Sequence, residues 1–126
     1  MVFAAVKQKD DRVIVKFQDS PGCDQDVQQY LDKMKDIYDK NEKFIILYDC
    51  LNIGWIGWNH IWMQANFMKA QEERTKNLMV RAAVVVDSQI ARAALNTLFT
   101  ARKPACPLEV FGNLENAKNY LRKAKF

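Results

Sequence analysis

Residues Met79 to Leu121 read MVRAAVVVDSQIARAALNTLFTARKPACPLEVFGNLENAKNYL and decide the fold. The apolar run that ends with Val84–Val86 predicts a buried strand, and the polar residues from Asp87 separate it from apolar residues at helical spacing. A second short apolar run, Leu108–Phe111, is followed by a glycine, an asparagine and another amphipathic stretch. Two strand-to-helix units in series are typical of an α/β domain.

The segments before this stretch predict the remaining strands and helices. Residues 2–8 and 12–18 read as a hairpin, because apolar residues alternate with polar ones in the second segment. Residues 24–41 place their apolar side chains on one helical face, with Asp24 as the expected N-cap. Residues 44–48 are apolar throughout and predict a central strand covered on both faces. A loop over residues 50–57 then leads to a single helix that ends near residue 77.

This order of elements predicts one α/β domain over residues 1–126. We expect a small, mixed, mostly parallel five-stranded sheet with an antiparallel N-terminal hairpin and four helices. A chain of 126 residues is long enough to bury a core without a metal ion or a disulfide. The three cysteines, Cys23, Cys50 and Cys106, are odd in number and lack the spacing of a zinc site. We therefore expect reduced thiols and no cofactor.

Localisation follows from what the sequence does not contain. Its amino end lacks the pattern of a signal peptide, and no apolar run reaches the roughly 20 residues that a membrane-spanning helix needs. We expect a cytoplasmic protein.

The net charge of +4 is distributed unevenly. Residues 1–100 carry 13 basic and 13 acidic side chains, so the excess lies in the last 26 residues. Such a basic tail is suited to phosphate or an anionic membrane surface, or it complements the carboxyl end of a helix. The aromatic residues lie elsewhere in the chain, and this separation disfavours nucleic-acid binding.

A family resemblance rests on apolar and turn positions in the second half of the chain. These positions are Val84-Val85-Val86, Ser88, Ile90, Arg92, Leu95, Leu98-Phe99, Arg102-Lys103-Pro104, Pro107, Val110-Phe111, Ala117 and Leu121. The pattern resembles the STAS-like (SpoIIAA-like) family, which is related to sulphate transporter and anti-sigma-factor antagonist domains. The resemblance implies helices packed mainly on one side of the sheet, and a protein-binding, nucleotide-binding or lipid-associated role instead of catalysis.

One departure from that family concerns regulation. In its phospho-regulated members, the strand that matches residues 44–48 is followed by a loop and by an Asp-Ser pair whose serine is phosphorylated. Residues Asp49 to His60 of this chain contain no serine or threonine. Without a hydroxyl there is no phosphate acceptor, so the phosphorylation switch is not carried over.

The most distinctive local feature is an aromatic cluster in the middle of the chain. On a helical wheel, one stripe contains Trp58, Ile61, Trp62, Ala65 and Met68, and a second, nearly opposite stripe contains Met63, Phe67 and Ala70. A surface helix normally needs one apolar face, so the second stripe must cover a neighbouring helix, a partner, a hydrophobic ligand or a membrane surface. The candidate binding residues are Trp55, Trp58, Trp62, Met63 and Phe67.

Other residues could carry chemistry. Asp49 and Asp87 each follow a predicted parallel strand, so their carboxylates could share one sheet edge and hold a metal ion or act as acid and base. His60 is the only histidine and could activate Cys50. Loop and helix-start contacts explain the same residues without catalysis. Ser88 and Arg92 are candidate anion-binding residues.

These observations favour a non-enzymatic binding or regulatory module that engages a protein partner, or a second copy of itself, through residues 55–67. The alternative is a carrier of a hydrophobic or lipid molecule, because STAS-like domains are similar in fold to CRAL-TRIO domains. A third hypothesis is an enzyme that uses Asp49, Asp87 and His60.

Overall fold

The computed structural model describes residues 4–18, 23–51, 58–101 and 103–126, apart from the side chains of residues 58, 59, 61, 91, 94 and 98. The helices and strands follow in the order β1 (Ala4–Lys9), β2 (Arg12–Phe17), α1 (Asp24–Asp39), β3 (Phe44–Asp49), α2 (Trp58–Ala70), α3 (Glu72–Leu78), β4 (Met79–Val85), α4 (Gln89–Ala101), β5 (Leu108–Phe111) and α5 (Leu114–Arg122).

The five strands form one sheet in the order β1-β2-β3-β4-β5. β1 and β2 are antiparallel, and every other neighbouring pair is parallel. The hairpin turns at Asp10, whose φ of 57° lies in the left-handed region that aspartate tolerates better than most residues. The predicted α/β class, the N-terminal hairpin and the mostly parallel sheet are therefore confirmed.

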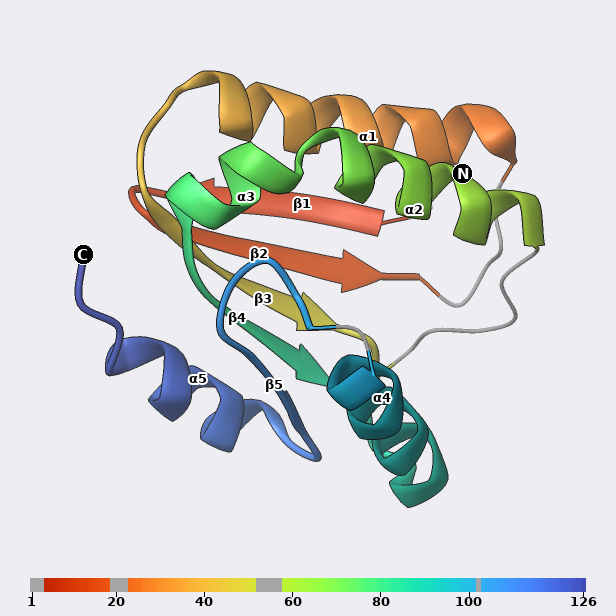
Figure 1. Ribbon diagram of the computed structural model, residues 1–126, viewed down its shortest axis with the longest axis vertical. Coiled ribbons are helices and arrows are strands. Elements are labelled where there is room, and N and C mark those ends of the chain that lie inside the picture. Colours follow the sequence, from red (N-terminus) through yellow and green to blue (C-terminus); the bar gives the residue numbers. More distant parts are fainter. Residues whose placement is uncertain (1–3, 19–22, 52–57, 102) are drawn as a thin grey trace.

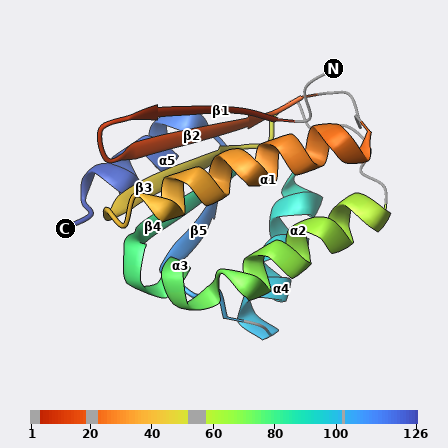
Figure 2. The same ribbon diagram turned by 90° about the horizontal axis from the view of Figure 1, so that it is seen from above.

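The helices cover the sheet unequally. Figure 1 shows α1, α2 and α3 on one face of the sheet and α5 on the other, with α4 beside the end of β4. In the view from above, α1 runs along the sheet and α2 lies next to it (Figure 2). We refer to these two sides of the sheet as the α1 face and the α5 face.

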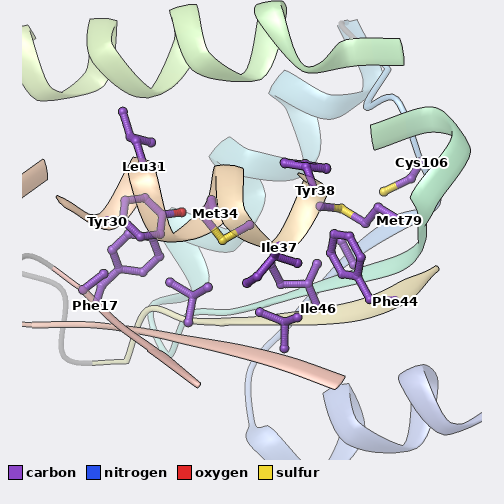
Figure 3. Packing of buried hydrophobic residues seen from close by; sticks show 14 of the residues in the cluster. Phe17, Tyr30, Leu31, Met34, Ile37, Tyr38, Phe44, Ile46, Met79 and Cys106 are labelled. Carbon is purple, nitrogen blue, oxygen red and sulfur yellow. The ribbon is translucent and has the colours of Figure 1, made fainter. Parts of the chain in front are cut away.

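The main core fills the space between the sheet and the α1 face. It is rich in aromatic and aliphatic side chains contributed by the hairpin, α1, β3 and β4 (Figure 3). Tyr38 is completely buried, its ring packs edge-on against Phe44 at 5.7 Å between centroids, and its hydroxyl lies 2.7 Å from the Thr75 hydroxyl. This contact fastens α3 to α1.

A smaller core occupies the α5 face. It consists of Ile45, Leu47, Ala83, Val85, Ala117 and Leu121. The Arg81 guanidinium lies over the Tyr120 ring at 4.6 Å and donates to the Tyr120 carbonyl oxygen at 2.8 Å, which fixes the end of α5 on β4. One short helix thus covers part of this side.

The predicted long helix is divided in two, which raises the number of helices from four to five. α2 ends at Ala70, and Gln71, the N-cap of α3, leaves the helical conformation with a φ of −101° and a ψ of 11°. Arg74 in the first turn of α3 donates to Asp39 at 2.7 Å, and Thr75 reaches Tyr38. These contacts with α1 turn α3 away from the path of α2, and helical periodicity does not encode them.

The start of α1 also differs by one residue from the prediction. The N-cap is Cys23 instead of Asp24, and its backbone N–H donates to the Asp26 carboxylate at 2.9 Å. This hydrogen bond lowers the pKa of Asp26 below its ordinary value. Asp24 is the first helical residue, and its carboxylate contacts α2 instead.

Candidate functional site

The outer side of α2 presents apolar side chains to solvent. Trp62 exposes 63% of its surface and Met68 exposes 42%, and Ala65 between them is also exposed. A tryptophan in this position is unusual, because most of its large apolar surface is normally covered in a folded protein. The helix therefore offers a protruding aromatic side chain, which is the kind of residue that anchors protein interfaces.

The opposite side of α2 faces the main core. Met63 and Phe67 are half-buried and pack against the core cluster, and the Phe67 ring lies 6.2 Å from the Tyr38 ring. These two residues of the second predicted stripe thus cover the main core, whereas the third, Ala70, is exposed. Part of each side chain remains at the surface, so a role of these two residues in binding stays a prediction.

The other two candidate residues of the aromatic cluster lie outside the description. Trp55 falls within residues 52–57, which the structure does not describe, and the same holds for the side chain of Trp58. A role of these two residues in binding therefore stays a prediction.

The first turn of α2 is fastened to the first turn of α1. His60 is buried, and its Nε2 lies 3.0 Å from the Asp24 carboxylate, which is itself exposed. This contact joins residues 36 positions apart, so no local pattern in the sequence indicates it. The only histidine of the chain thus connects α2 with α1, and this contact fixes the position of the exposed side of α2.

Two of the three cysteines, Cys50 and Cys106, are poorly suited to nucleophilic catalysis. All three lie within the described residues and form no disulfide. Burial, with a smaller contribution from Asp49, raises the pKa of Cys50 to about 12, and burial raises that of Cys106 to about 11. Both groups are therefore neutral thiols near pH 7, whereas the thiolate is the nucleophilic form.

The two strand-end aspartates occupy different environments. Asp49 is buried, and its carboxylate accepts a hydrogen bond from the Leu51 backbone N–H at 3.1 Å. Asp87 is exposed. Within the residues that the structure describes, no group of three or more His, Cys, Asp or Glu side chains could hold a metal ion. The contact of Asp49 with its own loop is typical of a structural role.

The candidate anion-binding residues lie at the start of α4. The Arg92 guanidinium donates to the carbonyl oxygens of Val86 and Asp87 at 2.8 and 3.0 Å. The same group lies so close to Gly112 that a Cβ there would be 2.8 Å from Nη1. Arg92 therefore links the end of β4 to the loop before α5, and anion binding by Ser88 and Arg92 remains a prediction.

In the described portion of the chain, no helix combines the length and the apolarity needed to cross a membrane.

The sequence of the chain matches a known protein family. A family model described as SpoIIAA-like matches residues 22–122. The chain belongs to the SpoIIAA-like family. The resemblance inferred from the sequence is thus confirmed, and the match covers the five helices and strands β3 to β5. A search of curated proteins finds no significant relative of this SpoIIAA-like chain.

Two solved structures share the fold of this SpoIIAA-like domain. A crystal structure of a DUF3478-family protein with a SpoIIAA-like fold from Shewanella loihica PV-4 matches with a TM-score of 0.73 and 11% identity, covering 94% of this chain and 91% of that one. An anti-sigma factor antagonist from Mycobacterium paratuberculosis matches with a TM-score of 0.62 and 11% identity, covering 95% and 93%. At this identity the likeness establishes the fold alone.

Proposed function

We propose that this SpoIIAA-like chain is a non-enzymatic regulatory module that binds a protein partner, or a second copy of itself, through residues 55–67. The observation that carries the proposal is the 63% exposure of Trp62 on α2. Covering an exposed tryptophan removes a large apolar surface from water, and tryptophan is enriched among the residues that dominate binding energy.

The contacts that hold α2 against α1 support this proposal. The His60–Asp24 contact holds its first turn, and Phe67 packs against Tyr38 further along. A helix fixed at two points presents Trp62 in a defined position, so little conformational entropy is lost when a partner binds. Core packing on one side and an exposed tryptophan on the other are what a docking helix requires.

The fold comparison supports a regulatory role by analogy. One structural neighbour is described as an anti-sigma factor antagonist, and proteins of that description act on protein partners. Because residues 49–60 of this chain contain no hydroxyl side chain, partner release by phosphorylation in that segment is not part of the proposal. The three free cysteines fit a reducing compartment, and we place the module in the cytoplasm.

The rival functions have less support. An enzyme based on Cys50 and His60 would need a thiolate, and burial keeps Cys50 protonated. A lipid carrier would need its aromatic side chains to enclose a cavity, whereas Trp62 is directed to solvent. Detection of co-purifying lipid by mass spectrometry would favour the carrier.

The proposal can be tested by photo-crosslinking in cells. The photoreactive residue p-benzoylphenylalanine is placed at position 62, and the control carries it at position 33, an exposed site on α1. We expect a specific protein crosslink, or a crosslinked dimer, from position 62 only. The identified partner is then purified and its affinity measured by calorimetry.

The Trp62→Ala variant completes this test. We expect it to weaken binding at least about tenfold, or to dissociate the dimer in analytical ultracentrifugation, with an unchanged melting temperature. Equal crosslinking from positions 62 and 33, or unchanged affinity of the variant, would show that α2 is not the docking surface.

A further inference from the structure

The α5 face contains a groove that is separate from the exposed side of α2. A concavity of about 260 Å³ lies between α5 and the neighbouring strands β2 and β3. Its apolar floor includes Ile14, Ile45, Leu47 and Leu121. Because α5 packs against β3, β4 and β5, it covers β2 only in part, and Ile14 exposes 41% of its surface. Figure 1 shows α5 on the side of the sheet opposite α1.

The register of the hairpin concentrates basic side chains beside this floor. Arg12 pairs with Ile45 and Ile14 pairs with Leu47, so these side chains point to the α5 face. On β1, Lys7 pairs with Ile14, Lys9 pairs with Arg12 and both share that face. With Lys16, which follows Ile14 on the same face, four exposed basic residues of the hairpin share this face with the exposed Ile14.

The opposite wall of the groove is also basic. Lys118 and Arg122 of α5 line it, and both are exposed. Arg122 donates to the Asn119 side-chain oxygen at 2.9 Å, and this hydrogen bond orients the guanidinium. Because the acceptor is a neutral amide, it does not neutralise the charge of Arg122. The groove-lining residues that the structure describes include no aspartate or glutamate. On the same face, Asp49 pairs with Lys16 across β2 and β3, but its carboxylate is buried and turned to its own loop.

We propose that this basic groove, defined by Arg12, Ile14, Ile45, Leu47, Lys118 and Arg122, binds an acidic peptide segment with apolar side chains on a partner protein. The acidic residues of the segment would meet the cations on both walls, and its apolar side chains would cover Ile14 on the floor. This surface lies across the sheet from α2, so the module would hold two partners at once.

The geometry favours a peptide over other anionic ligands. A membrane surface is flat and would contact the rim without filling the groove. A single-stranded nucleic acid is bound by aromatic side chains interleaved with cations, whereas the apolar residues that line this groove are all aliphatic. A small anion is held by polar groups that converge inside a pocket, and here the charges are on exposed rims above an apolar floor.

The experiment uses the whole chain and a defined probe. The probe is a fluorescein-labelled peptide in which two leucines are flanked by glutamates, and its control carries glutamines in place of the glutamates. Binding is followed by fluorescence anisotropy at low and physiological salt. We expect the glutamate peptide to bind, the glutamine peptide to bind at least about tenfold more weakly, and the affinity to fall with salt.

Charge reversal locates the binding surface. The double variant Lys118→Glu with Arg122→Glu should weaken binding at least about tenfold, and Ile14→Asp should do the same by making the floor polar and anionic. The matched control, Lys33→Glu with Lys76→Glu, changes the net charge equally at exposed positions on α1 and α3. The control and Trp62→Ala should leave the affinity within about twofold, which separates this proposal from the function proposed for α2.

Three results would overturn the proposal. One is the absence of glutamate-peptide binding at low salt, and another is equal weakening by the groove and control variants. The third is tighter binding of phosphatidylserine vesicles or of a thymidine oligonucleotide at the same residues, which would assign the groove to a membrane or to nucleic acid. Circular dichroism melting of every variant shows whether it is folded, so that a loss of binding is attributed to the surface.

Discussion

The two faces of the sheet differ in how completely they are covered. Three helices close the α1 face over a core that contains Tyr38 and Phe44, whereas α5 closes only part of the other face and leaves Ile14 exposed. Burial of apolar surface is the main source of stability, so the α1 face should hold the fold together. The α5 face can then carry charges without a large cost in stability.

The largest effect is expected in the main core. Phe44→Ala removes a ring that is 1% exposed and packs against Tyr38. We expect the free energy of unfolding to fall by about 3–5 kcal/mol, because transfer and cavity terms add. Urea denaturation followed by circular dichroism measures the change. A loss below about 1 kcal/mol would show that the α1 face does not dominate stability.

A smaller effect is expected for Leu121→Ala on the α5 face. Leu121 is buried against the sheet but also lines the groove, so the surroundings can relax toward solvent. The free energy of unfolding should fall by about 2–3 kcal/mol, at the low end for a leucine truncation. If the same urea series gives a loss as large as that of Phe44→Ala, the two faces contribute equally.

Removal of a single oxygen atom should break the hydrogen bond between Tyr38 of α1 and Thr75 of α3. Tyr38→Phe removes the hydroxyl that lies 2.7 Å from the Thr75 hydroxyl in the core. We expect a loss of about 1–2 kcal/mol, because the Thr75 hydroxyl stays buried without its partner. In a double-mutant cycle, Thr75→Val should restore part of this loss. Additive effects of the two substitutions would show that the hydrogen bond does not couple the helices.

The exposed side of α2 should be nearly neutral for stability. Trp62→Ala is expected to change the free energy of unfolding by less than about 0.5 kcal/mol, because its side chain contacts mainly water. Phe67→Ala on the core side of the same helix is the comparison and should cost more. Thermal melting of both variants checks the difference. An equal loss for both would place Trp62 in the core.

The smallest effect concerns pH. The hydrogen bond from Arg74 lowers the pKa of Asp39 below its ordinary value of 3.8. A lowered pKa stabilises the folded state above the unfolded value of 3.8, and this contribution is lost as the pH falls through the folded value. Asp39→Asn should therefore melt slightly below the wild type at pH 7 and together with it at strongly acidic pH. A constant difference across this range would contradict the ion pair.

Local patterns predicted most of the fold. The apolar runs at residues 44–48 and 84–86 match the buried segments of β3 and the end of β4, and the alternation in residues 12–18 matches β2. The break at Gln71 and the N-cap at Cys23 were not predicted. The break at Gln71 accompanies contacts of α3 with α1, which a local window does not contain. The cap at Cys23 is local, because its backbone N–H donates to Asp26, but cysteine is not among the residues that usually signal an N-cap.

The candidate site shows the same division. The helical wheel placed Trp62 and Phe67 on different sides of one helix, but only the structure shows that Phe67 faces Tyr38 while Trp62 faces solvent. The contact between His60 and Asp24 joins two helices and left no motif in the sequence. The identity of a residue such as tryptophan does not tell whether its side chain is exposed or buried, because tertiary packing decides this.

The sequence by itself determined the class of fold and, apart from the break between α2 and α3, the order of strands and helices, because these follow from spacings of 2 and 3.6 residues and from turn residues. The family was indicated by a resemblance at particular apolar and turn positions. Only the tertiary structure decided which apolar surface stays exposed and which charges meet. Along the chain, the excess positive charge lies in the last 26 residues. In space, hairpin register and the docking of α5 bring Arg12 and Arg122, 110 positions apart, to the same groove. Electrostatic attraction depends on distance in space, and the fold sets that distance.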